Sequence, residues 1–142
     1  MAHAYHHAVS SARRFRGTAE DYLAIHEWID GSKVAFSDHR HRALRHHSFG
    51  VYACEERFGK TIKNSDGIDV PVRTIAEQHI VEDLGYVPSV QDWFKHMNKE
   101  FWMTGRPLIE QFNPKKKSND KSAQKHNAHT RGLIQESLRI PT

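Results

Sequence analysis

Residues 60–72, KTIKNSDGIDVPV, decide how this chain is organised, because they predict a short β-hairpin inside an otherwise helical sequence. Two short runs with β-branched residues flank the segment 64–67, Asn-Ser-Asp-Gly. An Asp-Gly pair supplies the positive φ angles that a tight turn needs. We therefore expect two short antiparallel strands joined at this turn.

Helical signals lie on both sides of the hairpin. Upstream, residues 33–58 predict one long helix that ends at Gly59, a residue suited to the position just after a helix. Downstream, residues 73–84 predict a helix closed by Gly85, and Ser89 opens a short further helix.

The N-terminal part adds two more helices, over residues 3–15 and 19–30. Thr18 and Asp21 form an N-cap pair in front of the second of them. The fold class predicted is mainly α, a compact bundle of four to five helices with one small β-hairpin inserted. We expect residues 1–112 to form this helical domain.

Residues 113–142 predict a basic, flexible C-terminal tail. Within them, the segment 114–131 carries six Lys or Arg against one Asp and almost nothing apolar. Such a tail can hold nucleic acid through its phosphates, although solvated tails of this kind usually bind nothing specific.

Composition limits the class of protein. A chain of 142 residues with 37% hydrophobic and 27% charged residues has the size and polarity of one ordinary globular domain. No apolar run has the length of a membrane span, so no membrane is expected as a partner. Cys54 is the single cysteine, which excludes an intrachain disulfide, and the expected location is the cytoplasm.

Two costly polar residues fall on the apolar stripe of the predicted helix 33–58. At about 100° per residue, Arg40 and His47 share a face with the apolar residues of this segment, whereas Asp38 lies on another face. A buried arginine must be paired and a buried histidine must be hydrogen-bonded. An internal ion pair with a satisfied core histidine explains the pattern, and so does a functional site.

Other predicted helices also turn histidines inward. His3 and His7 are spaced i, i+4, which places both rings on one side of a helix, and His26 lies on the inner stripe of the next. His79 and Asp83 repeat the i, i+4 spacing, so the carboxylate can act as a second ligand or orient the ring. A simple His–Asp hydrogen bond is the alternative.

Convergence of these histidines favours a metal site. Helices of a compact bundle share one core, and imidazoles with a carboxylate between helices are the usual composition of a metal centre there. The candidate ligands are His3, His7, His47, His79, Asp83 and Asp38. The expected cofactor is a divalent zinc, manganese, iron or nickel ion.

Several stretches carry a family resemblance. The chain resembles an uncharacterised family of small bacterial and bacteriophage proteins in the stretches HAYHHAVSSARRF, YLAIHEWIDGSK, DHRHRALRHHSFG, KNSDGIDVPVR and EQHIVEDLGYVPSVQDW. The likeness covers residues 3 to about 105. The family is a domain of unknown function, so the resemblance implies a context without an activity. A looser similarity is to the helical metal-dependent phosphohydrolases named for an adjacent His-Asp pair, although this chain has the order Asp38-His39.

The activity predicted is metal-dependent hydrolysis of a phosphate ester or nucleotide. A metal ion would activate water and neutralise charge that develops on the phosphoryl oxygens. Arg40 would hold a phosphate oxygen, and Glu77 or His26 would serve as the base.

The alternative is a non-catalytic, bacteriophage-type binding protein that engages a host protein, a nucleic acid or a nucleotide. Trp28, Trp93 and the segment 101–103 supply apolar contact surface for such a role or for a homodimer. Aromatic clusters more often close a core.

Overall fold

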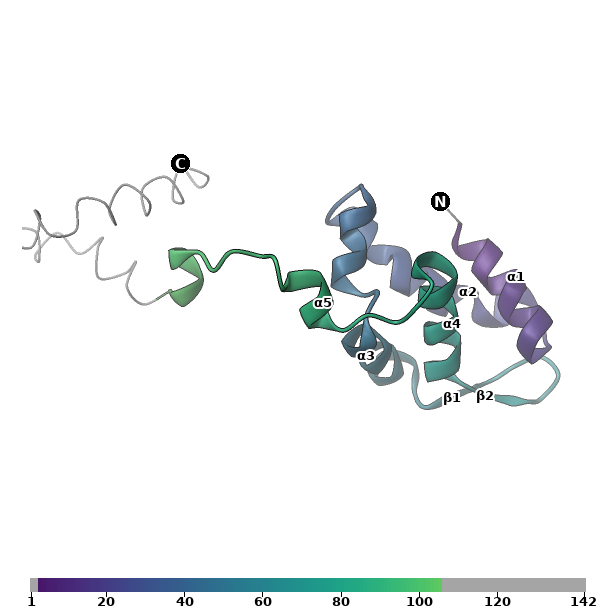
Figure 1. Ribbon diagram of the computed structural model, residues 1–142. Coiled ribbons are helices and arrows are strands. Elements are labelled where there is room, and N and C mark those ends of the chain that lie inside the picture. Colours follow the sequence, from purple (N-terminus) through teal and green to yellow (C-terminus); the bar gives the residue numbers. More distant parts are fainter. Residues whose placement is uncertain (1–2, 106–142) are drawn as a thin grey trace, which may run out of the picture. The chain divides into compact units, whose positions relative to one another are not determined.

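The computed structural model describes residues 3–105 of the chain. The chain divides into two units, Met1–His96 and Met97–Thr142, and the first contains almost all of the described elements (Figure 1). Of the second unit, the structure describes residues 97–105, with the 3-10 helix η3 over Phe101–Thr104. The predicted basic tail, residues 113–142, lies outside the described residues.

The first unit is mainly helical, as the sequence predicted. Its elements are α1 (Ala4–Phe15), α2 (Ala19–Asp30), η1 (Gly31–Val34), η2 (His39–Leu44), α3 (Ser48–Phe58), β1 (Thr61–Lys63), β2 (Asp69–Pro71), α4 (Val72–Leu84) and α5 (Val90–Phe94). Helix α4 contacts α1, α2 and α3 (Figure 1). A side chain on the inner face of α4 can therefore meet residues from three other helices.

The prediction of one long helix over residues 33–58 is wrong. Two 3-10 helices and the shorter helix α3 take its place. The backbone is extended at Asp38, whose side chain accepts the N–H of Arg40, and again at His47, whose ring accepts the N–H of Gly50. Side chains that bond to nearby backbone groups favour caps and turns over continuous helix.

The predicted hairpin is confirmed. Strands β1 and β2 pair antiparallel, with Ile62 opposite Val70 and Lys63 opposite Asp69. Gly67 takes a positive φ of 76° in the connecting segment. The connection is longer than a two-residue turn, and the N–H of Asn64 closes it by donating to the carbonyl of Ile68 at 2.9 Å.

Asn64 also anchors the hairpin to the turn between α1 and α2. Its buried Nδ2 donates to the carbonyl of Phe15 and to the hydroxyl of Tyr22, each at 3.1 Å. Its Oδ1 accepts the N–H groups of Asp66 and Ile68. One side chain thus joins two parts of the chain that are far apart in sequence.

The core lies between α1, α2, α3, α4 and the hairpin. Its buried apolar residues include Tyr22, Ile25, Ile29, Cys54 and Ile75. Several fully buried side chains beside this core are histidines, so the interior is partly polar.

Candidate metal centre

Four buried histidines meet around α4, and we call them the histidine cluster: His7, His26, His46 and His79. They come from α1, from α2, from the segment before α3 and from α4. His79 is the central member, with ring-centroid distances of 4.0 Å to His7, 5.2 Å to His26 and 5.1 Å to His46. All four are at most 1% exposed, so this is an interior feature.

Two aspartates face the cluster. Nε2 of His79 lies 3.2 Å from Oδ1 of Asp30 and 3.3 Å from Oδ2 of Asp83. Nε2 of His46 lies 3.0 Å from the same Asp83 oxygen and 3.6 Å from the same Asp30 oxygen. Two nitrogens and two oxygens thus gather within 4.8 Å of one another, and we call Asp30, His46, His79 and Asp83 the ligand set.

Asp83 is the most heavily contacted carboxylate of the set. Its Oδ1 lies 3.3 Å from Nε2 of His7 and 3.5 Å from the guanidinium of Arg42. Burial would raise the pKa of Asp83, but hydrogen bonds from His46, His7 and His79 hold it well below its ordinary value. Asp83 is therefore a carboxylate at neutral pH.

The other groups of the centre divide by charge. Burial opposes ionisation of Asp30, yet its hydrogen bond with His79 lowers its pKa, so it is also charged. Burial lowers the pKa of His46, and burial with the neighbouring charge of His79 lowers the pKa of His26 to about 3. For His7, hydrogen bonds with Asp83 and Glu82 outweigh burial and raise the pKa.

A chain of hydrogen bonds leads away from His79, and we call it the relay. Nδ1 of His79 lies 2.9 Å from Nδ1 of His26, whose Nε2 lies 2.8 Å from the hydroxyl of Ser11. Ser11 donates to Oε1 of Gln78 at 2.8 Å, and Nε2 of Gln78 donates to Glu82 at 2.5 Å.

Some buried polar atoms of the centre have no hydrogen-bond partner among the described residues. They are Nδ1 of His46 and Oδ2 of Asp30, although this oxygen lies 3.5 Å from Nζ of Lys33. A buried polar atom without a partner costs about 1–3 kcal/mol, and each such atom in a native fold needs an explanation. Asp30 therefore faces the ligand set through Oδ1, while its Oδ2 points to Lys33.

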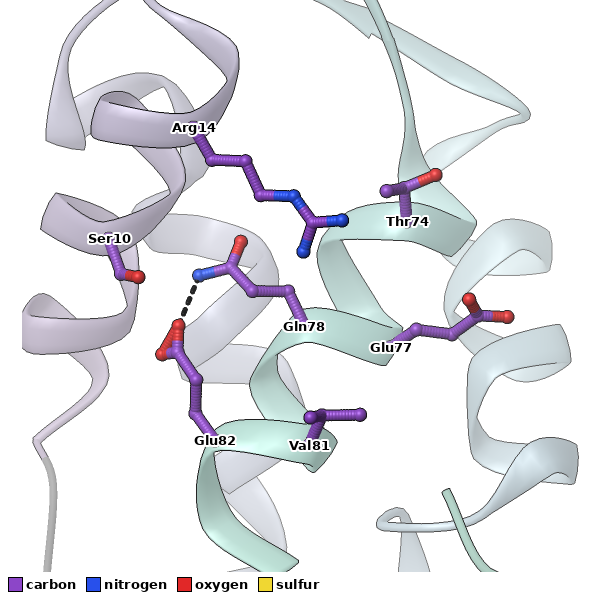
Figure 2. Close-up of a pocket in the computed structure, with 7 residues that line it drawn as sticks. All are labelled: Ser10, Arg14, Thr74, Glu77, Gln78, Val81 and Glu82. Atoms are coloured by element: carbon purple, nitrogen blue, oxygen red, sulfur yellow. Dashed lines mark hydrogen bonds between the residues drawn. The ribbon is translucent and has the colours of Figure 1, made fainter. Parts of the chain in front are cut away.

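A pocket of about 390 Å³ adjoins the relay between α1 and α4 (Figure 2). The residues that line it are Ser10, Arg14, Thr74, Glu77, Gln78, Val81 and Glu82. The Arg14 side chain extends from α1 toward α4, and Glu82 forms part of the wall. Because Oε2 of Glu82 also accepts a hydrogen bond from Nδ1 of His7 at 3.1 Å, this residue links the pocket to the histidine cluster.

Of the candidate residues named from the sequence, four lie together at the centre. These are His7, His26, His79 and Asp83. The i, i+4 pair of His79 and Asp83 faces the same point, as its helical spacing predicted.

The remaining candidates lie elsewhere. His3 is exposed at the N-cap of α1, and Glu77 pairs with Arg73 at 2.8 Å on the outer face of α4. Asp38 and Arg40 form an exposed ion pair at 2.7 Å, so the inward position expected for Arg40 is wrong. That expectation rested on continuous helical phase through residue 40, which the extended backbone at Asp38 interrupts.

His47 is buried but performs a different task. Its Nδ1 accepts the N–H of Gly50 at 2.9 Å, and its Nε2 donates to the carbonyl of Ala43 at 3.0 Å. Nδ1 therefore caps α3 and Nε2 bonds to the backbone of η2, which leaves neither nitrogen for a metal.

Sequence reasoning missed Asp30 and His46. Asp30 follows His26 at i, i+4, the same spacing that singled out Asp83 after His79, so a signal was present. His46 was not among the candidates, because one continuous helix over residues 33–58 places its neighbour His47 on the inner stripe; the extended backbone at His47 interrupts that phase, and His46 reaches Asp83.

The geometry defines a small, mainly helical domain with a histidine and aspartate centre in its core. Residues 2–103 match a domain of unknown function, DUF6915, so the chain belongs to that family. No curated protein and no solved structure matches the chain. Among the described residues, no helix combines the length and apolar character that a membrane crossing requires.

Proposed function

We propose that this domain binds one divalent metal ion at Asp30, His46, His79 and Asp83. The observation that carries the proposal is the spacing of the four ligand atoms. Imidazole nitrogens and carboxylate oxygens bind zinc at about 2.0–2.1 Å, so tetrahedral ligands lie about 3.3–3.4 Å apart. The four nitrogen–oxygen distances of the set are 3.0, 3.2, 3.3 and 3.6 Å, which bracket that value.

The donor types narrow the choice of metal. Two imidazoles with two carboxylates suit zinc, manganese, iron or nickel, whereas calcium and magnesium prefer a shell of oxygens. The two carboxylates also balance the double positive charge of such an ion.

Burial favours a structural role for the ion. The four ligand side chains are between 0 and 9% exposed, and together they complete a four-coordinate shell. Structural zinc sites are closed in this way, whereas catalytic sites keep one position open. An ion here would join α2, the segment before α3 and α4 into one unit.

Phosphate-ester hydrolysis is the second candidate, and the pocket is the observation that favours it. The Arg14 guanidinium supplies positive charge at the pocket, and Glu82 connects its wall to His7. For catalysis, one of the four ligands would have to leave so that water can bind the ion. Asp30 is the candidate for this exchange, since its side chain is the most exposed of the set at 9%. Of the residues that the sequence predicted for this reaction, Arg40 forms an exposed ion pair with Asp38 away from the pocket, whereas Glu77 lines the pocket and pairs with Arg73.

A binding role without metal, with nucleic acid, a host protein or a second copy as partner, is the third candidate. The basic segment that would contact nucleic acid lies outside the described residues, so this role stays a prediction from the sequence.

Metal analysis of the full chain, purified without chelator, tests the first proposal. We expect near-stoichiometric metal in the wild type, its loss in His79→Ala, and its retention in His39→Ala, which changes an exposed histidine. Cobalt titration of the metal-free wild type gives an independent readout, since tetrahedral cobalt absorbs in the visible range. A folded wild type that holds no metal and binds no cobalt overturns the proposal.

Hydrolysis has its own assay. Metal-loaded wild type is expected to cleave bis-p-nitrophenyl phosphate under this second proposal, with activity lost in Arg14→Ala while metal content is kept. No turnover by a fully loaded protein on mono- and diester substrates contradicts hydrolysis and leaves the structural role.

A further inference from the structure

The order of donors and acceptors along the relay is fixed, and Glu82 determines it. A carboxylate can only accept, so the Gln78 amide presents its NH₂ group to Glu82 and its carbonyl oxygen to Ser11. The same NH₂ group donates to the carbonyl of His7 at 3.3 Å, which fixes the amide orientation a second time.

Ser11 in turn determines which ring nitrogen of His26 is protonated. The Ser11 hydroxyl has one proton, and it is donated to Oε1 of Gln78. The contact of 2.8 Å between Ser11 and Nε2 of His26 therefore requires His26 to be the donor. His26 carries its proton on Nε2.

His26 then sets the tautomer of His79. A buried histidine whose hydrogen-bond partners in the described structure are Ser11 and His79 is neutral and has one proton. With that proton on Nε2, Nδ1 of His26 is an acceptor, and Nδ1 of His79 at 2.9 Å must donate to it. Nε2 of His79 is left facing two carboxylate oxygens, at 3.2 and 3.3 Å.

We infer that Ser11, His26 and Gln78 are positioning residues that hold His79 with Nδ1 protonated and Nε2 directed at a bound cation. The inference rests on the proposed metal centre. A lone pair that faces two carboxylates is repelled unless a positive centre lies between them, so the relay selects for a metal ion or a proton at that point. Residues that orient a ligating histidine typically change metal affinity 10–100-fold when they are removed.

The relay also explains the composition of α1 and α4 at this point. Ser11 is 0% exposed and Gln78 is 5% exposed, and the hydrogen bonds of their side chains go to His26, His7, Glu82 and each other. Apolar residues would fill the same positions without the cost of burying a hydroxyl and an amide. Their contribution is to fix which ring nitrogen of His26 and of His79 carries the proton.

Zinc affinity of Ser11→Ala tests the inference in the full-length protein, by competition with a chromophoric chelator. We expect zinc to bind 10–100-fold more weakly, since His26 is then free to reverse its tautomer. Ser11→Thr keeps the hydroxyl and should restore the affinity. Ser32→Ala is the matched control, because Ser32 is also buried and bonded to a histidine, His41, outside the relay.

Nitrogen-15 NMR of the histidine rings keeps the inference testable even where a variant fails to fold. In the wild type, Nε2 of His26 and Nδ1 of His79 should both be protonated, with and without zinc. Protonation of His26 on Nδ1, or wild-type affinity in a folded Ser11→Ala, overturns the relay alone. A wild type that binds no zinc overturns the metal centre itself, so the two failures are distinguishable.

Discussion

The ring of His47 accepts the backbone N–H of Gly50 at 2.9 Å, and this contact fixes where α3 begins. The extended backbone at His47 turns the preceding residue, His46, into the core, where it reaches Asp83. A capping histidine and a histidine of the proposed metal centre are therefore neighbours in sequence with separate contacts.

Replacement of His47 by alanine should lower stability without removing metal. Loss of an N-cap costs about 1 kcal/mol, within a range of about 0.5–2 kcal/mol. Urea unfolding measures the loss, and metal analysis of the same sample measures the second expectation. His47→Asn keeps an acceptor at the cap and should recover part of the stability. Loss of metal from a folded His47→Ala would place His47 in the centre after all.

Zinc should stabilise the wild type by mass action. At a free concentration one hundred times its Kd, zinc raises the free energy of unfolding by about 2.7 kcal/mol. Thermal unfolding with and without zinc measures this increment. Asp83→Asn should show almost none of it, whereas Asp69→Asn, which alters an exposed carboxylate of the hairpin, should show all of it. An equal increment in both variants would place the zinc elsewhere.

Asn64→Ala should destabilise the fold by about 2–3 kcal/mol, because it removes the part-buried hydrogen bonds that join the α1–α2 turn to the hairpin and close the hairpin connection. Chemical unfolding measures the change. Asn98→Ala, at an exposed position, should be neutral. Stability equal to wild type in Asn64→Ala would show that the hairpin holds its place without this anchor.

The thiol of Cys54 should be unreactive in the native protein. Burial and the nearby charge of Glu55 raise its pKa from 9.0 to about 12, so the reactive thiolate is about a thousandfold scarcer than in the unfolded chain. Between these two pH values the unfolded chain loses this proton and the folded chain keeps it. Cys54 therefore reduces stability as pH rises above 9.0 and has no such effect below.

Labelling with Ellman's reagent at pH 8, with and without denaturant, checks the prediction for Cys54. Slow labelling in the native state and fast labelling in denaturant are expected. Equal rates would mean that the thiol is accessible in the native fold.

Local signals were sufficient for much of the fold. The cap pair of Thr18 and Asp21 marks the start of α2, and both halves of the capping box are formed. Ser89 and Asp92 do the same for α5, and Gly85 takes the left-handed conformation that ends α4. These features depend on residues within one turn of each other, so a sequence pattern contains them.

The segment 31–47 shows where such signals fail. Its helical periodicity is real in the sequence, but the side chains of Asp38 and His47 accept hydrogen bonds from backbone N–H groups and interrupt the helix. The ligand set depends on contacts such as His46 with Asp83, which are 37 residues apart. Helical spacing within one segment could find the pair His79 and Asp83, and also Asp30 four residues after His26, whereas His46 required the tertiary arrangement.

The direction of the relay also limits how this family can diverge. A change at Ser11 alone frees both rings to reverse, and a change at Gln78 alone removes the group that fixes Ser11. Descendants that alter one of these residues should either restore the order of donors and acceptors with a second change or abandon His26 as well. Substitutions at the relay positions of α1, α2 and α4 should therefore occur together in evolution. Substitutions at neighbouring surface positions should occur independently of one another.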